Sequence, residues 1–245
     1  MRRQTSVIYL VIIFVMVASL FGTVPAQADD RARVFVQFAP GQKANVQTAL
    51  HAIDAEIHYT FDKLNAFAVS LPDAAIQGLR RNPNVVLIEA DPLREAIGAR
   101  PAAEATNPQT VPYGVEMVQA LEVWDTDHNG VVDEGAPTGA NRTICIIDSG
   151  LDITHEDIQG VSVSGYDGNL PWATDGYGHG THVAGTMAAM NNSLGVVGVT
   201  PGAVNLYIVR VFGDNGKWAY ASDLIDAANH CQAAGAHIIS MSLSG

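Results

Sequence analysis

The sequence predicts two folded units, an α+β unit with the element order βαββαβ followed by an α/β unit with a mostly parallel sheet. The first prediction rests on strand and helix patterns that alternate between residues 33 and 92. The second rests on the later part of the chain, where apolar strands alternate with helical patterns and glycines punctuate both. With 245 residues, of which 48% are hydrophobic and 16% charged, the chain is long enough to bury a substantial core.

The first unit is expected to contain four strands and two helices. Residues 66–71 read Ala-Phe-Ala-Val-Ser-Leu and alternate as a strand does, while Ala74, Ile76 and Leu79 recur near helical spacing. Pro72 followed by Asp73 starts the second helix. The predicted strands are 34–38, 56–61, 66–71 and 85–90, and the predicted helices are 43–53 and 73–81. This order predicts a ferredoxin-like sandwich over residues 29–92.

The second unit follows a segment without a sustained period. Residues 93–110 are rich in Ala and Pro, which predicts a linker open to proteolysis over 93–108. After the linker the pattern predicts buried strands at 142–148, 205–212 and 236–241 and a helix at 221–234. Strands that alternate with helices indicate a parallel sheet whose functional groups gather at the carboxyl ends of the strands.

The first 28 residues follow the pattern of an export signal. Arg2 and Arg3 precede an apolar run over 7–21, and Ala26-Gln27-Ala28 forms a small-x-small cleavage site. An uncleaved anchor is the alternative, but the run is shorter than the roughly 20 residues that span a bilayer. We therefore expect cleavage after Ala28, a secreted and extracellular protein, and no stable membrane association afterwards.

The net charge and the cysteine content exclude two further classes of protein, nucleic-acid-binding proteins and disulfide-rich scaffolds. The formal net charge of −12 argues against nucleic acid as a partner, because such partners need clustered Lys and Arg. Two cysteines, Cys145 and Cys231, are too few for a disulfide scaffold. The sequence leaves open whether they pair with each other or with a partner beyond residue 245.

Two motifs carry the chemistry. The strand over 143–147 delivers Asp148-Ser149-Gly150 to the carboxyl edge of the sheet, and about 30 residues later Gly178-His179-Gly180-Thr181-His182-Val183-Ala184-Gly185-Thr186 opens a helix of small residues. Taken singly, Asp148 reads equally well as a carboxylate that caps a turn, and His179 as a packed histidine at a helix start. Together and in this order the two strings resemble the subtilase family, whose triad runs Asp, His, Ser along the chain.

The resemblance implies a role for each residue. Asp148 would orient the imidazole and stabilise its charged form, and His179 would act as general base and later as general acid. His182, one helical turn on, is expected to pack or to support the helix. A metal site built from His155, His179 and His182 is the rival interpretation, but it lacks the HExxH spacing and an acidic third ligand.

Two further stretches resemble the substrate-pairing strands of subtilases. In the stretch 238–245, Ser242, Leu243 and Ser244 would line the specificity pocket through main-chain hydrogen bonds, although the family usually has Gly where Ser244 stands. In the stretch 212–216, Gly213 and Gly216 would lie on the opposite strand, with Tyr220 over an outer apolar subsite. Core packing is the alternative role for the aromatic residues Phe212 and Tyr220.

Residues 191–199 are similar to a calcium loop of bacterial subtilisins. The resemblance implies oxygen ligands from Gln109, Asp157, Met190, Asn192, Leu194 and Val196, which suit calcium, whereas a Gly-rich solvent loop is the alternative. The stretch from Gln109 to Val115 resembles a subtilisin N-terminus, so processing is expected shortly before Gln109. Residues 125–134 begin like an EF-hand loop, but Ala136 stands at the twelfth position, so calcium binding and a plain acidic turn both remain open.

The sequence contains no Gly-Thr-Ser-x-Ala string that could supply the nucleophile. We therefore expect the catalytic Ser to lie beyond the end of this chain, which as written should be inactive. The resemblance implies a secreted, monomeric serine endopeptidase that acts on polypeptides and is made as a zymogen, with its propeptide as intramolecular inhibitor. The alternative is a non-catalytic protein in which the propeptide-like domain acts as a protease inhibitor or chaperone.

Overall fold

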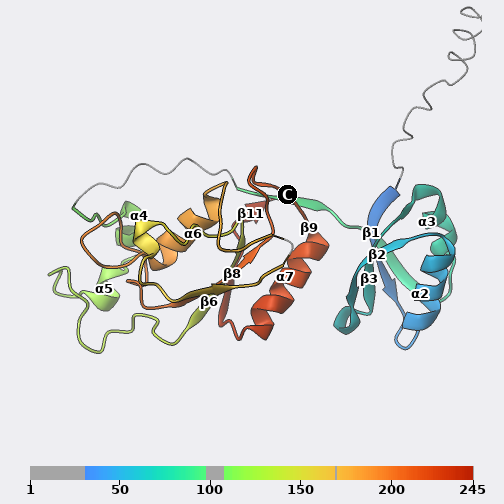
Figure 1. Ribbon diagram of the computed structural model, residues 1–245. Helices are drawn as coiled ribbons and strands as arrows, with labels where there is room; N and C mark the ends of the chain where they lie inside the picture. Colours follow the sequence, from blue (N-terminus) through green and yellow to red (C-terminus); the bar gives the residue numbers. More distant parts are fainter. Residues whose placement is uncertain (1–30, 98–107, 169, 245) are drawn as a thin grey trace, which may run out of the picture.

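The computed structural model describes residues 31–97, 108–168 and 170–244, which form two units lying side by side (Figure 1). The predicted export signal, residues 1–28, lies outside the described residues, and so does the predicted processing site shortly before Gln109. No helix among the described residues combines the length and the hydropathy needed to cross a membrane.

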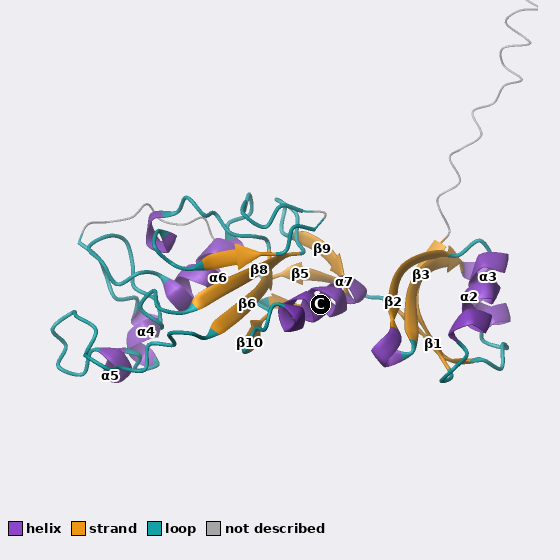
Figure 2. Ribbon diagram, turned by 60° about the horizontal axis from the view of Figure 1, so that its bottom comes forward, coloured by secondary structure: helices purple, strands orange, loops and turns teal. Residues whose placement is uncertain are grey.

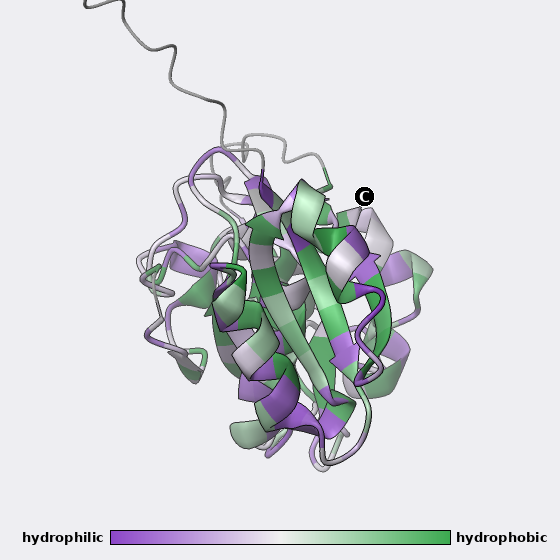
Figure 3. Ribbon diagram, turned by 90° about the vertical axis from the view of Figure 1, so that its right-hand side faces the viewer, coloured by the Kyte–Doolittle hydropathy of each residue, from purple (hydrophilic) through white to green (hydrophobic). Residues whose placement is uncertain are grey.

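The first unit is a four-stranded antiparallel sheet in the order β2-β3-β1-β4, with its two α-helices on one face (Figure 2). Alternate residues of β1 point into the core, where Val36 packs with Val46 and Leu50 of α2 and with Phe67 of β3. Figure 3, in which this unit faces the viewer, shows hydrophobic residues concentrated along its strands. Its elements are β1 (Arg31–Phe38), α2 (Lys43–Ala52), β2 (Glu56–Phe61), a 3-10 helix (Asp62–Leu64), β3 (Ala66–Pro72), α3 (Asp73–Leu79) and β4 (Val85–Ala90).

The second unit is built on a parallel sheet in the order β10-β6-β8-β7. Ile144 and Ile146 of β6 pack with α6 on one face, whereas Cys145 and Ile147 pack with α7 on the other. Because successive side chains of a strand point to opposite faces, β6 is covered on both sides and the unit has three layers. Its elements are α4 (Tyr113–Met117), α5 (Leu121–Trp124), β6 (Thr143–Asp148), a 3-10 helix (Glu156–Ile158), β7 (Val163–Gly165), α6 (His179–Ala188), β8 (Asn205–Arg210), α7 (Ala221–Ala233) and β10 (Ile238–Ser240).

The prediction of a linker from residue 93 onward was wrong at its start. Residues Leu93–Ala96 form strand β5, which pairs antiparallel with β9 (Lys217–Tyr220) on one side and β11 (Leu243–Ser244) on the other. Four residues are too few to show a period, and both partners of β5 lie more than 100 residues further along the chain. The strand exists because the second unit supplies its hydrogen bonds.

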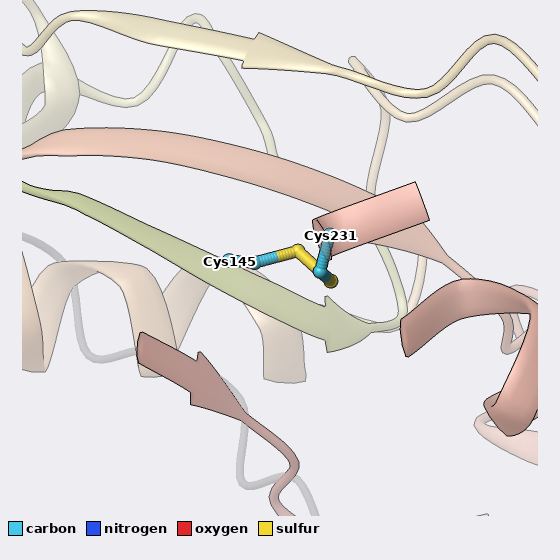
Figure 4. The surroundings of a disulfide bond; sticks show 2 residues. All are labelled: Cys145 and Cys231. Carbon is cyan, nitrogen blue, oxygen red and sulfur yellow. A yellow bond between two sulfur atoms is a disulfide. The ribbon is translucent and has the colours of Figure 1, made fainter. Parts of the chain in front are cut away.

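Cys145 and Cys231 form a disulfide that joins β6 to α7 (Figure 4). Both cysteines are fully buried in the core between this helix and the sheet. The disulfide therefore ties the strand that ends in Asp148 to the helix that follows β9.

Candidate active site

Asp148 is the last residue of β6 and His179 the first residue of α6, and their side chains are hydrogen-bonded. His179 Nδ1 lies 2.7 Å from Asp148 Oδ1, which allows Asp148 to orient the imidazole as the sequence motifs implied. Asp148 is fully buried and His179 is 8% exposed. A carboxylate bonded to Nδ1 fixes the ring and directs Nε2 away from the carboxylate, as acid–base chemistry requires.

Two opposing effects act on the Asp148 carboxyl. Burial raises its pKa, while hydrogen bonds from His179 and from the Ser149 backbone N–H act to lower it, and the net direction is upward. The Ser149 N–H donates to Asp148 Oδ1 over 2.7 Å. Asp148 Oδ2 is also buried and has no hydrogen-bond partner among the described residues. The pair is therefore held largely through one carboxylate oxygen.

The backbones around the pair pack closely. A Cβ on Gly180 would lie 2.2 Å from the carbonyl oxygen of Gly150, so only glycine allows the helix start to approach the strand end. Gly178 has φ +85° and supplies no side-chain cap to α6. Instead, the carboxylate of Asp175 accepts hydrogen bonds from the N–H groups of Gly178 and Thr181. Sequence reasoning missed Asp175, although an acidic residue just before a helix is a known capping signal.

β5 lies between the two strands that the sequence assigned to substrate pairing. Leu243 and Ser244 pair with Ala96 and Glu95, and the Ile97 N–H donates to the Ser242 carbonyl over 3.5 Å. On the other side the Ala96 N–H donates to the Gly216 carbonyl over 3.2 Å.

The opposite pairing strand includes Gly216 and Tyr220 as predicted, but not Gly213. Its pairs with β5 come from Lys217–Tyr220, whereas Gly213 lies in the preceding turn and its carbonyl accepts the Gly216 N–H. Phe212 is fully buried, as the packing alternative required. The guanidinium of Arg33 stacks over the ring of Tyr220, with its central carbon 3.9 Å from the ring centroid. The sequence predicted an apolar subsite at this ring, and a charged group of the first unit lies there.

The predicted calcium loop brings its oxygens together around Gln109. The Gln109 amide nitrogen lies 2.7 to 3.2 Å from four oxygens, namely the carbonyls of Met190, Leu194 and Val196 and Oδ1 of Asn192. An amide group has two hydrogens to donate, so four acceptors at one point exceed its capacity. Oxygen-only clusters of this kind fit calcium. Asp157 borders the loop and accepts the Val196 N–H through Oδ1 over 3.0 Å.

The sequence offered two other candidate metal sites, the acidic loop 125–134 and a set of three histidines. Asp125, Asp127 and Asp133 each place one oxygen within 4.8 Å of the others. Their carboxylates also accept N–H groups of their own loop, as an acidic turn would, including Gly130 N–H on Asp125 and Thr126 N–H on Asp133. In the histidine set, Nδ1 of His179 is taken by Asp148 and Nδ1 of His155 accepts the Asp157 N–H.

The fold and the site define an α/β protein with a buried Asp–His pair at the carboxyl edge of a parallel sheet. Residues 139–245 match the model of the subtilase family, Peptidase_S8. The thermostable alkaline protease of Halalkalibacterium halodurans is 30% identical over 95% of this chain and 58% of its own length. Subtilisin E of Bacillus subtilis (strain 168) is 31% identical over 96% of this chain and 58% of its own length.

These findings support a subtilase identity for residues 139–245. The chain spans a little over half the length of the curated relatives it matches. Among solved structures it is similar to fervidolysin from Fervidobacterium pennivorans, described as a keratinolytic enzyme related to subtilisin. The TM-score is 0.64 at 20% identity, over 88% of this chain and 36% of that one. This likeness concerns the fold, which is subtilisin-like with a parallel sheet.

Proposed function

We propose that the chain carries the inhibitory unit and the Asp–His half of a serine endopeptidase that hydrolyses polypeptides. The hydrogen bond of 2.7 Å between Asp148 and His179 is the observation that carries the proposal. Asp148 holds the imidazole through Nδ1, and His179 Nε2 takes the proton of an attacking serine hydroxyl and later delivers it to the leaving amine. In this proposal that serine lies beyond residue 245, because the sequence contains no Gly-Thr-Ser-x-Ala string.

The position of β5 supports a zymogen. An extended substrate binds a protease by adding a strand between the two pairing strands, and β5 makes such backbone pairs with β9 and β11. A substrate and β5 cannot occupy this place together. The first unit, a propeptide of ferredoxin-like fold in this proposal, would therefore inhibit the enzyme until it is cut away. Export through residues 1–28, release outside the cell and a monomeric state belong to the same proposal.

Calcium would be held by Gln109, Asn192 and the carbonyls of Met190, Leu194 and Val196, with Asp157 bordering the site. When bound, the ion would be coordinated by the converging oxygens and would fix the loop that follows α6. The Gln109 side chain would then turn its oxygen toward the ion.

The experiment is fluorophosphonate labelling of the processed protein expressed from the complete reading frame. We expect labelling of a serine and hydrolysis of a casein substrate, and His179→Ala should lower both by about 10⁴-fold or more because the nucleophile loses its base. His182→Ala is the matched control, since this histidine is exposed one turn along the same helix and should leave both unchanged. Full labelling of the His179→Ala protein would refute the proposal, as would a complete protein that inhibits proteases but takes no label.

A further inference from the structure

Asp175 lies in the loop before α6, and its carboxylate accepts four hydrogen bonds. Oδ1 accepts the Gly178 N–H and the Ser149 hydroxyl, each over 2.8 Å. Oδ2 accepts the Thr181 N–H over 2.8 Å and the Thr181 hydroxyl over 2.7 Å. A carboxylate has about four acceptor positions, so this side chain is saturated.

These bonds complete the start of α6. The first N–H groups of a helix have no partner within it, and a side chain at the N-cap normally accepts the N–H of the third residue. Here the N-cap is Gly178, which has no side chain, and Thr181 is the third residue. Asp175 supplies the missing acceptor from outside the helix, and its negative charge suits the helix N-terminus.

The same carboxylate reaches the strand that carries Asp148. Ser149 is fully buried, donates its hydroxyl to Asp175 and accepts the Gly180 N–H through the same oxygen over 2.9 Å. Gly180 follows His179 directly. One chain of hydrogen bonds therefore runs from the residue after Asp148, through Asp175, to the helix turn that contains His179.

We infer that Asp175 is a positioning residue that sets the contact between Asp148 and His179. Its hydrogen bonds go to neighbours of the pair, namely to Ser149, which follows Asp148, and to Gly178 and Thr181, which stand before and after His179 in the chain. The inference rests on the proposed function for its consequence in catalysis, since a misplaced imidazole cannot take a proton from a serine. The contact itself can be measured in the 245-residue chain, independently of any catalysis.

The test is proton NMR of the 245-residue chain with ¹⁵N-labelled histidine. A proton held between His179 Nδ1 and a carboxylate resonates at low field, and His179→Ala identifies the signal by removing it. In Asp175→Ala we expect the signal to move upfield and to exchange with water about fivefold faster or more, the factor that loss of one helix cap supplies.

Asp152→Ala is the matched control. Its carboxylate also accepts a threonine N–H and hydroxyl, those of Thr154, but touches neither α6 nor Ser149 through its side chain. The control should keep the low-field signal of the unaltered chain. Should Asp175→Ala fail to fold, Ser149→Ala removes only the hydroxyl bridge and should shift the signal in the same direction.

The outcomes separate the two proposals. An unchanged signal in folded Asp175→Ala or in Ser149→Ala, or an equal change in Asp152→Ala, would overturn the positioning role and leave the proposed function standing. A folded chain that lacks the low-field signal from the start would contradict the Asp148–His179 contact and overturn both. If the NMR results are as expected but the processed protein from the complete reading frame takes no fluorophosphonate label, only the proposed protease function would be refuted.

Discussion

Asp148 meets two conflicting requirements at the scale of a single residue. Its proposed role needs the ionised carboxylate, but its burial raises the pKa and favours the protonated form. The hydrogen bonds from His179 and Ser149 oppose burial without cancelling it. A site that keeps a buried charge for function is expected to cost stability.

This conflict predicts how stability depends on pH. Because the folded-state pKa of Asp148 lies above its unfolded value, the stability from this group is complete below pH about 4 and is lost as pH rises through the raised pKa. Asp148→Asn removes the titration, so the variant should become more stable than the unaltered chain as pH rises. Each unit of upward shift corresponds to about 1.4 kcal/mol of unfolding free energy. Urea unfolding between pH 4 and 8 measures the difference.

Asp152→Asn is the control with the opposite sign. The hydrogen bond from the Thr154 hydroxyl lowers the pKa of Asp152. The stability that this carboxylate contributes is therefore present above its unfolded-state pKa and is lost as pH falls through the lowered folded-state pKa. This variant should be less stable than the unaltered chain at neutral pH, and the difference should vanish in acid. Parallel curves for the two variants would contradict the assignment of a raised pKa to Asp148.

At the scale of elements, local sequence predicts some segments closely and others not at all. β6 was expected over 142–148 and spans Thr143–Asp148, because an uninterrupted apolar run ends in a polar string. The start of α6 follows from its glycines and small residues. β5 and the exact bounds of its partner strand, Lys217–Tyr220, could not be predicted, because both depend on pairing between distant segments.

β5 should tolerate a charge only on its exposed side. Ala96 is 7% exposed and packs with Phe212 and Ala219, so Ala96→Glu would bury an unpaired carboxylate and detach the strand. Leu93→Glu places the same residue on the same strand at an exposed position and is the control. We expect backbone amides of β9 to exchange with deuterium about tenfold faster or more in Ala96→Glu, the factor for a loss of about 1.4 kcal/mol. Equal protection in both variants would contradict the pairing.

At the scale of the whole molecule, polar side chains join the two units at the start of α7. Asp91, at the end of the first unit, accepts the Ser222 N–H through Oδ1 over 2.9 Å and so caps this helix from outside. Arg33 bonds to Asp91, Ser222 and Asp223, and the Tyr59 hydroxyl also donates to Asp223. Arg33 and Asp223 lie 190 residues apart, so no local pattern could have revealed this network.

Removing Arg33 should loosen the contact between the units. The Asp91 side chain is fully buried and the Arg33 side chain is 15% exposed, so Arg33→Ala leaves a buried carboxylate without its cation. Breaking such a pair costs about 3 kcal/mol or more. We expect a corresponding loss in urea unfolding and faster deuterium exchange at the Ser222 N–H, which bonds to Asp91.

Arg31→Ala is the matched control for this prediction, because Arg31 lies two residues earlier on the same face of β1. Its ion-pair partner Asp54 is 99% exposed and belongs to the same unit, so the loss should stay below about 1 kcal/mol. Exchange at Ser222 should then remain as in the unaltered chain. If Arg33→Ala costs no more than Arg31→Ala, the buried ion pair does not hold the units together, and β5 and contacts such as the Lys63–Gln232 hydrogen bond must account for their association.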